Sequence, residues 1–243
     1  MPLLNKYTMT TEVLPSQVDF QCKLGYYDTF RFFMDLANKH ATILGVGQRS
    51  LMERGLFWLT VKTRVKFFRR PEMAQTIQAE TWPVKPLSLR TDRCYRLLDN
   101  QGLIAEGRTE WAILDMNTQH LAPVGNIFPT ELVFNSEDFS VTDFPRLVPD
   151  NSSPALGTYH VTSSDIDMGM HMNNAAYIRA LLGMISLSDL QKMDIQDFTI
   201  IFKSPAHQFD DLTYRELRNN NVIDCGFYFP DGKCAVLARL VCR

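Results

Sequence analysis

The sequence lacks paired cysteines, long apolar runs and an excess of charge of one sign. Its five cysteines are scattered without a CxxC pair, and the net charge is −2. These features argue against a disulfide framework or a zinc site, suit a reducing compartment and give no overall signal for nucleic-acid binding. No segment approaches the roughly 18 apolar residues of a membrane-spanning helix, and the first residues have no signal-peptide or transit-peptide character. We therefore expect a cytoplasmic protein with no membrane span, no bound metal, no cofactor and no nucleic-acid partner.

The first half predicts one long helix followed by four strands. Apolar side chains recur at helical spacing from Phe30 to Leu44, and Gly45 then ends the helix. Asp28 and Thr29 are suitable caps for its start. Strand-like runs follow at residues 57–68, 76–84, 88–98 and 103–114, with a hairpin turn at residues 100–102.

The second half repeats this order. An apolar stripe predicts a helix that begins near Asn173, and strand-like runs cover residues 198–203, 212–217, 222–229 and 233–241. Between the halves, the proline-rich residues 123–156 predict a linker. This pattern predicts an α+β fold with two tandem units, residues 1–122 and 157–243, each a long helix wrapped by a curved antiparallel sheet. The alternative is the ordinary alternation of helices and strands in an α+β protein without duplication.

The segment before the second helix concentrates groups that can do chemistry. Asp165, Asp167, His171, Asn173 and Asn174 lie within ten residues, beside a helix N-terminus that stabilises negative charge. A neutral imidazole can take a proton from water, so His171 is the candidate base. Asp167 either orients this imidazole or closes a turn. Asn173 either caps the helix or orients a substrate carbonyl, and Asp165 is interpreted as structural.

Together these residues resemble the acyl-acyl carrier protein thioesterases of bacteria and plant plastids. The family signature runs Asp-x-Asp-x-Asn-x-His-Val-Asn-Asn with a tyrosine three residues on, and it is matched by Asp165, Asp167, His171, Asn173, Asn174 and Tyr177. In the first half, residues 55–59, 80–83, 110–111 and 114–115 resemble family segments in the same order. The likeness covers roughly residues 5–242. It implies a double hotdog fold and the release of free fatty acid from acyl carrier protein without a cofactor.

Two positions depart from the family pattern. Gly169 replaces the family's asparagine between the acid and the histidine, where it would let a substrate approach closely. The family's glutamate or cysteine after the second helix falls at Pro205 and Ala206. His207 lies just beyond and is a candidate replacement that reaches the substrate, although a solvated loop histidine is the commoner case. These departures motivate a second hypothesis, in which the chain is a degenerate family member that binds acyl groups with little turnover. A third hypothesis is a thioesterase that acts on acyl-coenzyme A.

The resemblance also assigns roles to the first half. Phe33 and Trp58 are candidates for lining the acyl channel, although an apolar helix stripe is by default plain core. Lys62, Arg64 and Lys66 alternate along one strand and so share a face. That face is either an ordinary solvated surface or a docking site for an acidic acyl carrier protein. Two tandem units would make the chain a monomer with an internal pseudo-dimer, without excluding a homodimer.

Overall fold

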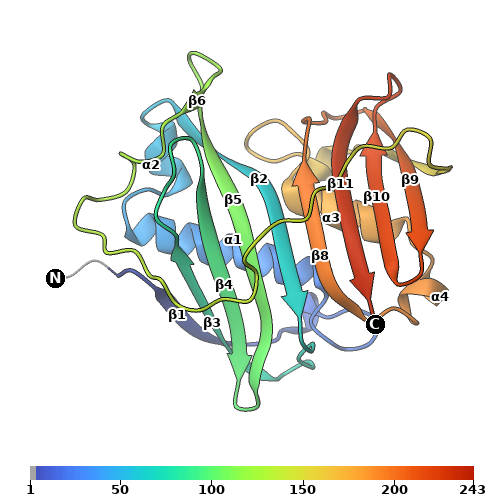
Figure 1. Ribbon diagram of the computed structural model, residues 1–243, viewed down its shortest axis with the longest axis horizontal. Coiled ribbons are helices and arrows are strands. Elements are labelled where there is room, and N and C mark those ends of the chain that lie inside the picture. The colour runs from blue at the N-terminus through green and yellow to red at the C-terminus, as the bar shows by residue number, and fades with distance from the viewer. Residues whose placement is uncertain (1–3) are drawn as a thin grey trace. The chain divides into compact units, whose positions relative to one another are not determined.

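The computed structural model describes residues 4–243 and divides the chain into two compact units, one ending at Thr142 and one beginning at Asp143. Each unit contains an antiparallel sheet with a helix against one face (Figure 1). The α+β class predicted from the sequence is confirmed in each unit. No helix within residues 4–243 combines the length and the apolar character that crossing a bilayer requires.

The first unit has five main strands in the order β1-β3-β4-β5-β2, and each neighbouring pair is antiparallel. A short strand, β6, pairs with β5. The elements are β1 (Tyr7–Glu12), a 3₁₀ turn (Pro15–Gln17), α1 (Tyr26–Ile43), α2 (Gln48–Met52), β2 (Leu56–Phe67), β3 (Thr76–Pro83), β4 (Thr91–Asp99), β5 (Gly102–Asp115) and β6 (Leu121–Ala122).

The second unit has five strands in the order β8-β11-β10-β9-β7, again antiparallel throughout. Its elements are β7 (Ala155–His160), a 3₁₀ turn (Ser163–Asp165), α3 (Asn174–Gly183), α4 (Leu187–Leu190), β8 (Ile195–Phe202), β9 (Asp211–Asn219), β10 (Val222–Tyr228) and β11 (Cys234–Cys242). The eight strands and both main helices predicted from periodicity are present, with ends displaced by a few residues.

Several local predictions are wrong. Helix α1 begins at Tyr26 after the N-cap Gly25, so Asp28 and Thr29 lie inside its first turn and do not cap it. The Thr29 hydroxyl instead donates to the Gly25 carbonyl at 3.0 Å. Helix α3 has only 10 residues against 18 in α1, so the second helix is not long. Strand β7 begins at Ala155, so the end of the predicted linker is part of a sheet.

Helix α1 packs on the inner face of the first unit's sheet through side chains spaced three and four residues apart. This buried stripe consists of Phe30, Phe33, Leu36, Ala37 and His40. The ring of Phe33 is fully buried and stacks on Tyr95 of β4 with 4.7 Å between the centroids. Beneath it, Gly107 of β5 has no side chain, and an added Cβ would lie 2.5 Å from a ring carbon of Phe33.

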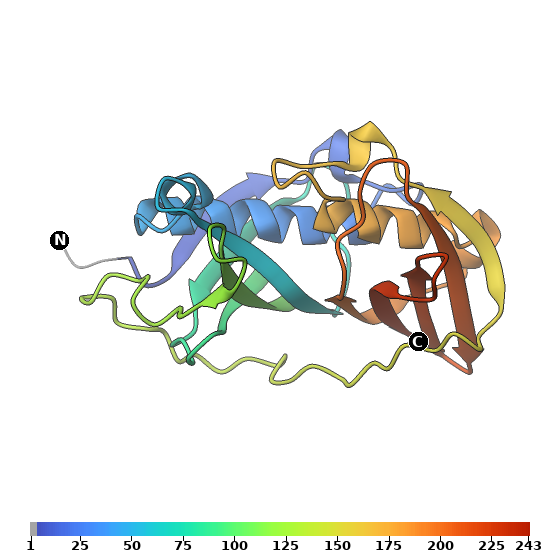
Figure 2. The ribbon, with the colours of Figure 1, turned by 90° about the horizontal axis from the view of Figure 1, so that it is seen from above.

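The outer face of the same sheet is crossed by residues 135–142, on the side opposite α1 (Figure 2). Arg96 and Arg108 donate to the carbonyls of Asp138 and Thr142, at 2.7 and 2.6 Å. The amide of Ser140 donates to Glu106 at 2.8 Å. Charged side chains of the outer face therefore hold the first part of the segment that follows β6.

We predict that Gly107→Ala destabilises the protein by about 1–3 kcal/mol, because the new methyl group overpacks against a ring that cannot move away. The free energy of unfolding in urea measures this loss. Gly125→Ala is the matched control, since a Cβ there meets no atom within 4 Å. Equal stabilities of the two variants would contradict the packing described for Phe33.

Candidate active site

A tight turn carries His171 to the surface just before α3. The Asp167 amide donates to the His171 carbonyl at 3.0 Å, and the Met170 amide donates to the Asp167 carbonyl at 3.0 Å. Met170 has a φ of +60°, a conformation that side chains other than glycine seldom adopt. The turn is anchored from outside by the Met172 amide, which donates to the Ala206 carbonyl at 2.7 Å. His171 is exposed on this anchored turn.

Asp167 closes this turn and does not contact the imidazole. One carboxylate oxygen accepts from the Gly169 amide at 2.8 Å, and the other accepts from Asn173 Nδ2 at 3.1 Å. Within residues 4–243 the ring of His171 makes no hydrogen bond. Of the two readings of Asp167, these contacts are those of a turn-closing residue, and the alternative hydrogen bond to the His171 imidazole is not formed in the structure.

Asn173 is the N-cap of α3, as expected. Its Oδ1 accepts from the Ala175 amide at 2.8 Å, which satisfies one of the unpaired donors of the helix start. Because its Nδ2 also donates to the Asp167 carboxylate, the helix cap and the turn are held together. The first backbone N–H groups of α3 therefore lie directly after the turn that carries His171.

The hydroxyl of Tyr177 fixes the segment after β8 beside this helix. It accepts from the Ala206 amide at 3.0 Å and donates to the Ser204 carbonyl at 3.4 Å. Burial raises the pKa of Tyr177 further above its usual value, so this hydroxyl stays protonated. Ala206 is fully buried, so the position where the resemblance places a glutamate or cysteine holds a small core residue.

His207 follows Ala206 and meets His171. The two imidazole centroids lie 4.8 Å apart, with the rings inclined at 69°. The His207 side chain is 60% exposed, and its Nδ1 lies 3.8 Å from Asp210. The His207 amide also donates to Asp210, at 2.7 Å. The structure thus brings together the two histidines that the sequence singled out.

Asp165 is buried and has the structural role expected of it. It accepts from the Tyr159 hydroxyl at 3.0 Å, from Thr162 at 2.8 and 2.9 Å, and from Arg179 at 2.6 Å. Burial by itself raises the pKa of this carboxyl, but the hydrogen bonds from Thr162, Tyr159 and Arg179 outweigh it and hold the pKa below the usual value. Tyr159 and Arg179 were not predicted, because no sequence spacing connects them to this turn.

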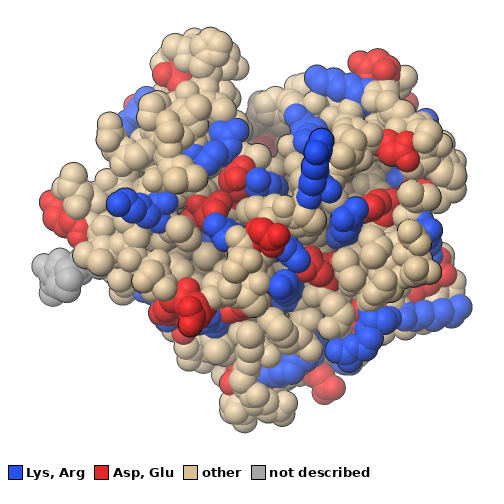
Figure 3. Space-filling view, viewed as in Figure 1, with Lys and Arg blue, Asp and Glu red and all other residues tan. Residues whose placement is uncertain are grey.

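The candidate residues of the first unit lie in its core and on its outer face. Phe33 is part of the core, and the half-buried Trp58 donates through Nε1 to the Val46 carbonyl at 2.9 Å. Lys62, Arg64 and Lys66 share the outer face of β2, as their alternation predicts. Lys62 forms an ion pair with Glu110 at 3.0 Å, and Lys66 donates to the Ser140 carbonyl at 2.9 Å. Basic and acidic side chains are interspersed across the face in Figure 3, so this strand does not form a purely basic patch.

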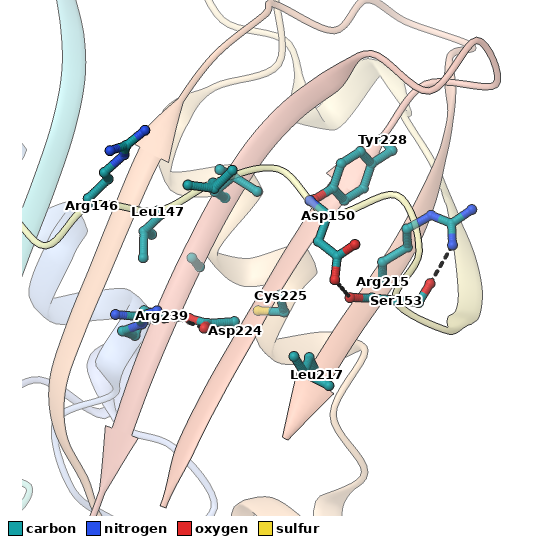
Figure 4. A pocket seen from close by; sticks show the side chains of 13 residues that line it. Arg146, Leu147, Asp150, Ser153, Arg215, Leu217, Asp224, Cys225, Tyr228 and Arg239 are labelled. Carbon is teal, nitrogen blue, oxygen red and sulfur yellow. Dashed lines mark hydrogen bonds and ion pairs between the residues drawn. The ribbon is translucent and has the colours of Figure 1, made fainter. Parts of the chain in front are cut away.

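A pocket of about 220 Å³ lies on the outer face of the second unit's sheet, beneath residues 146–153 (Figure 4). Its charged groups are largely engaged within the chain. Arg239 forms a two-pronged ion pair with Asp224 at 2.6 and 2.7 Å, and Arg215 donates to the Ser153 carbonyl at 2.5 Å. The pocket contains none of the predicted site residues.

The arrangement around His171 suits proton transfer at a solvent-exposed position. An exposed imidazole, a neighbouring second imidazole and a capped helix N-terminus lie together, and such a helix end favours developing negative charge. Within the described part of the chain, no group of three or more His, Cys, Asp or Glu side chains is arranged to hold a metal ion.

Comparison with protein families matches both halves of the chain. Residues 4–130 match the model described as the acyl-ACP thioesterase N-terminal domain, and residues 150–229 match the acyl-ACP thioesterase C-terminal domain. An oleoyl-acyl carrier protein thioesterase of Coriandrum sativum is 22% identical over 70% of this chain and 46% of its own length. A second such enzyme, from Arabidopsis thaliana, is 24% identical over 69% of this chain and 50% of its own. The chain spans about half the length of these curated relatives.

Solved structures show the same fold. An acyl-ACP thioesterase of Bacteroides thetaiotaomicron superposes with a TM-score of 0.89 at 21% identity, covering 98% of both chains. The 12:0-ACP thioesterase of Umbellularia californica superposes with a TM-score of 0.85 at 16% identity, covering 98% of this chain and 97% of that one.

We predict that Tyr177→Phe costs about 1–3 kcal/mol of stability, because it leaves the buried Ala206 amide without an acceptor. Urea denaturation measures the loss, and hydrogen exchange at the Ala206 amide should speed up. Tyr27→Phe is the control, since within residues 4–243 the Tyr27 hydroxyl has no hydrogen-bond partner. Unchanged stability and exchange in Tyr177→Phe would contradict the anchoring role of this hydroxyl.

We also predict that the advantage of the wild type over Asp165→Asn depends on pH. The folded pKa of Asp165 is lowered, so the charged carboxylate stabilises the fold above the ordinary carboxyl pKa of about 4 and loses that contribution as pH falls. The difference should be about 1.5–3 kcal/mol at pH 7 and should shrink toward pH 3. Thermal unfolding across this range measures it, with the exposed Asp35→Asn as control. A stability difference between wild type and Asp165→Asn that stays constant down to pH 3 would show that the charge of Asp165 does not stabilise the fold.

Proposed function

The chain belongs to the acyl-ACP thioesterase family, and from that premise we propose that it hydrolyses the thioester of acyl-acyl carrier protein and releases free fatty acid. The observation that carries the proposal is the match of both family models, in order, to the two halves of one chain. The signature segment around His171 supports it, because an exposed imidazole lies there beside a helix N-terminus.

We propose that the two units are tandem hotdogs, one within residues 1–122 and one within residues 157–243, joined by residues 123–156. The antiparallel sheet and central helix of each unit support this assignment. A tandem pair supplies within one chain what two subunits would otherwise supply, so the protein acts as a monomer or as a homodimer of such chains. The five free cysteines suit a cytoplasmic location.

In the proposed mechanism, His171 takes a proton from a water molecule as the water oxygen attacks the thioester carbonyl carbon. The tetrahedral intermediate carries its negative charge near the first N–H groups of α3. When the carbon–sulfur bond breaks, the proton on His171 passes to the departing thiolate. Asp167 acts through the turn and through Asn173, which it holds in place; both are positioning residues in this scheme.

The remaining candidates bind substrate or carrier. Gly169 leaves room for the thioester beside the turn, His207 contacts the acyl carbonyl or the water, and Phe33 and Trp58 line the acyl channel. The acidic acyl carrier protein docks on Lys62, Arg64 and Lys66. Lys62 is already paired with Glu110, and Lys66 already donates to the Ser140 carbonyl. Docking must therefore replace these partners with carboxylates of the carrier protein.

A second function, acyl binding with little turnover, is supported by Gly169 and by the buried Ala206 at the position of the family's glutamate or cysteine. It differs from the first in the fate of the thioester, which would be held intact. Acyl-coenzyme A is an alternative thioester for either function.

We predict that His171→Ala lowers kcat for thiol release from acyl-acyl carrier protein about 100- to 10,000-fold, the range of general base catalysis. Release of free thiol, followed with a chromogenic disulfide, measures the rate. His120→Ala replaces an exposed histidine of the first unit and should leave kcat unchanged. An unaltered rate in His171→Ala, with folding intact, would remove His171 from the mechanism.

A further inference from the structure

Exposed apolar side chains lie on the two segments that carry the histidines of the candidate site. Met168 and Met170, in the turn before α3, are 69% and 73% exposed, and Phe209, in the segment after β8, is 72% exposed. Among residues 4–243, only two other large apolar side chains, Leu87 and Val133, are more exposed than Met168. Single exposed apolar residues are ordinary, but their concentration at one site indicates contact with a ligand or partner.

The backbone of the same two segments is strained. Met170 has a φ of +60° and Phe209 has a φ of +74°, and side chains other than those of asparagine and aspartate seldom adopt this left-handed region. In the second unit, the one other residue besides glycine with a positive φ is Asn220, which tolerates it. Strain of this kind concentrates at functional sites. The chain therefore exposes Met170 and Phe209 at a cost in both conformation and solvation.

Hydrogen bonds fix both strained residues next to the imidazole pair. The Phe209 amide donates to the Val161 carbonyl at 2.9 Å, and the Met170 amide is bound within its own turn. Met170 directly precedes His171, and Phe209 follows His207 by two residues. The two imidazole centroids lie 4.8 Å apart. The backbone that brings the imidazoles together thus also presents two apolar side chains to solvent.

The substrate of the proposed reaction extends from the thioester in two directions. On the carbonyl side is the acyl chain, which is apolar along its length. On the sulfur side is the pantetheine arm, which ends on a carrier protein too large to enter a binding site. This arm must cross the solvent-exposed edge of the site, where apolar side chains already in water can contact it. Its pantoyl group, which has two methyl groups on one carbon, is its bulkiest apolar part.

We infer that Met168, Met170 and Phe209 bind the pantetheine arm of the thioester substrate at the edge of the site. The inference rests on the proposed thioesterase function, because that function requires the arm to reach His171. The flexible methionine side chains adapt to an irregular partner, and the phenyl ring offers a flat surface for the pantoyl methyl groups. Coenzyme A contains the same arm, so these side chains recognise the arm without choosing between the two carriers.

The test compares two thioesters of octanoic acid. Octanoyl-pantetheine contains the pantoyl group, whereas octanoyl-N-acetylcysteamine keeps only the end of the arm beside the sulfur. Met170→Gly and Phe209→Gly should each raise the KM of the pantetheine thioester about 3- to 10-fold, because less apolar surface leaves water on binding, and should change the KM of the shorter thioester less than about 2-fold. Met170→Leu keeps an apolar side chain and should keep the wild-type KM. Leu87→Ala, which removes an exposed apolar side chain of the first unit, is the control.

Thermal unfolding separates this role from a structural one. Glycine adopts a positive φ without strain, so Met170→Gly and Phe209→Gly should keep the wild-type melting temperature or exceed it. Ala74→Gly, at a φ of +66° in the first unit, is the matched control and should leave both KM values unchanged.

Two results would overturn the inference. An equal rise in KM for both thioesters would assign the side chains to the acyl chain or to the placement of His171, and unchanged KM values would show that they contact no part of the substrate. Failure of the proposed function would appear separately, as absence of thiol release by the wild type from either thioester. In that case the dissociation constants of the same two thioesters, measured by calorimetry, test the contact with the arm in the same way.

Discussion

The hydroxyl of Tyr177 is the contact on which the second unit's site depends. It binds the backbone on both sides of Pro205, at Ser204 and Ala206, and so fixes a segment that has no regular structure of its own. The carbonyl of Ala206 then accepts the Met172 amide. One phenol therefore aligns the turn of His171 with the segment of His207, and the two imidazoles meet as a consequence.

The two carboxylates of the signature segment have different structural roles. Asp165 is buried under Arg179 and Tyr159 and holds the approach to the helix, while Asp167 closes the turn and holds the N-cap Asn173. Neither carboxylate touches His171. In the proposed mechanism the imidazole therefore works without a carboxylate partner, and the helix N-terminus and the second imidazole supply the polar surroundings.

The sequence was sufficient for the elements with strong periodicity and insufficient for those without it. The alternating strands and the stripe of α1 were correctly expected, because burial on one face leaves a clear pattern. Strands β1 and β7 were missed because each is a six-residue strand at the end of its sheet and buries little on either face. The caps at Asp28 and Thr29 were wrong because their residue type favours a cap, whereas the helix begins earlier, at Gly25.

The site was predicted in its residues and not in its contacts. The signature named His171, Asp167 and Asn173, but the direction of the Asp167 carboxylate depends on a turn with a left-handed Met170, which residue type does not reveal. The meeting of His171 with His207 depends on Tyr177, whose role emerges only from tertiary packing.

The most direct measurement is release of free thiol by the wild type from a panel of acyl-acyl carrier proteins, beside the same acyl-coenzyme A set. We expect rapid turnover of at least some carrier-protein substrates, with a preferred chain length and slower reaction of the coenzyme A thioesters. Binding of these substrates without thiol release from any of them would contradict it, and would assign the chain to acyl binding.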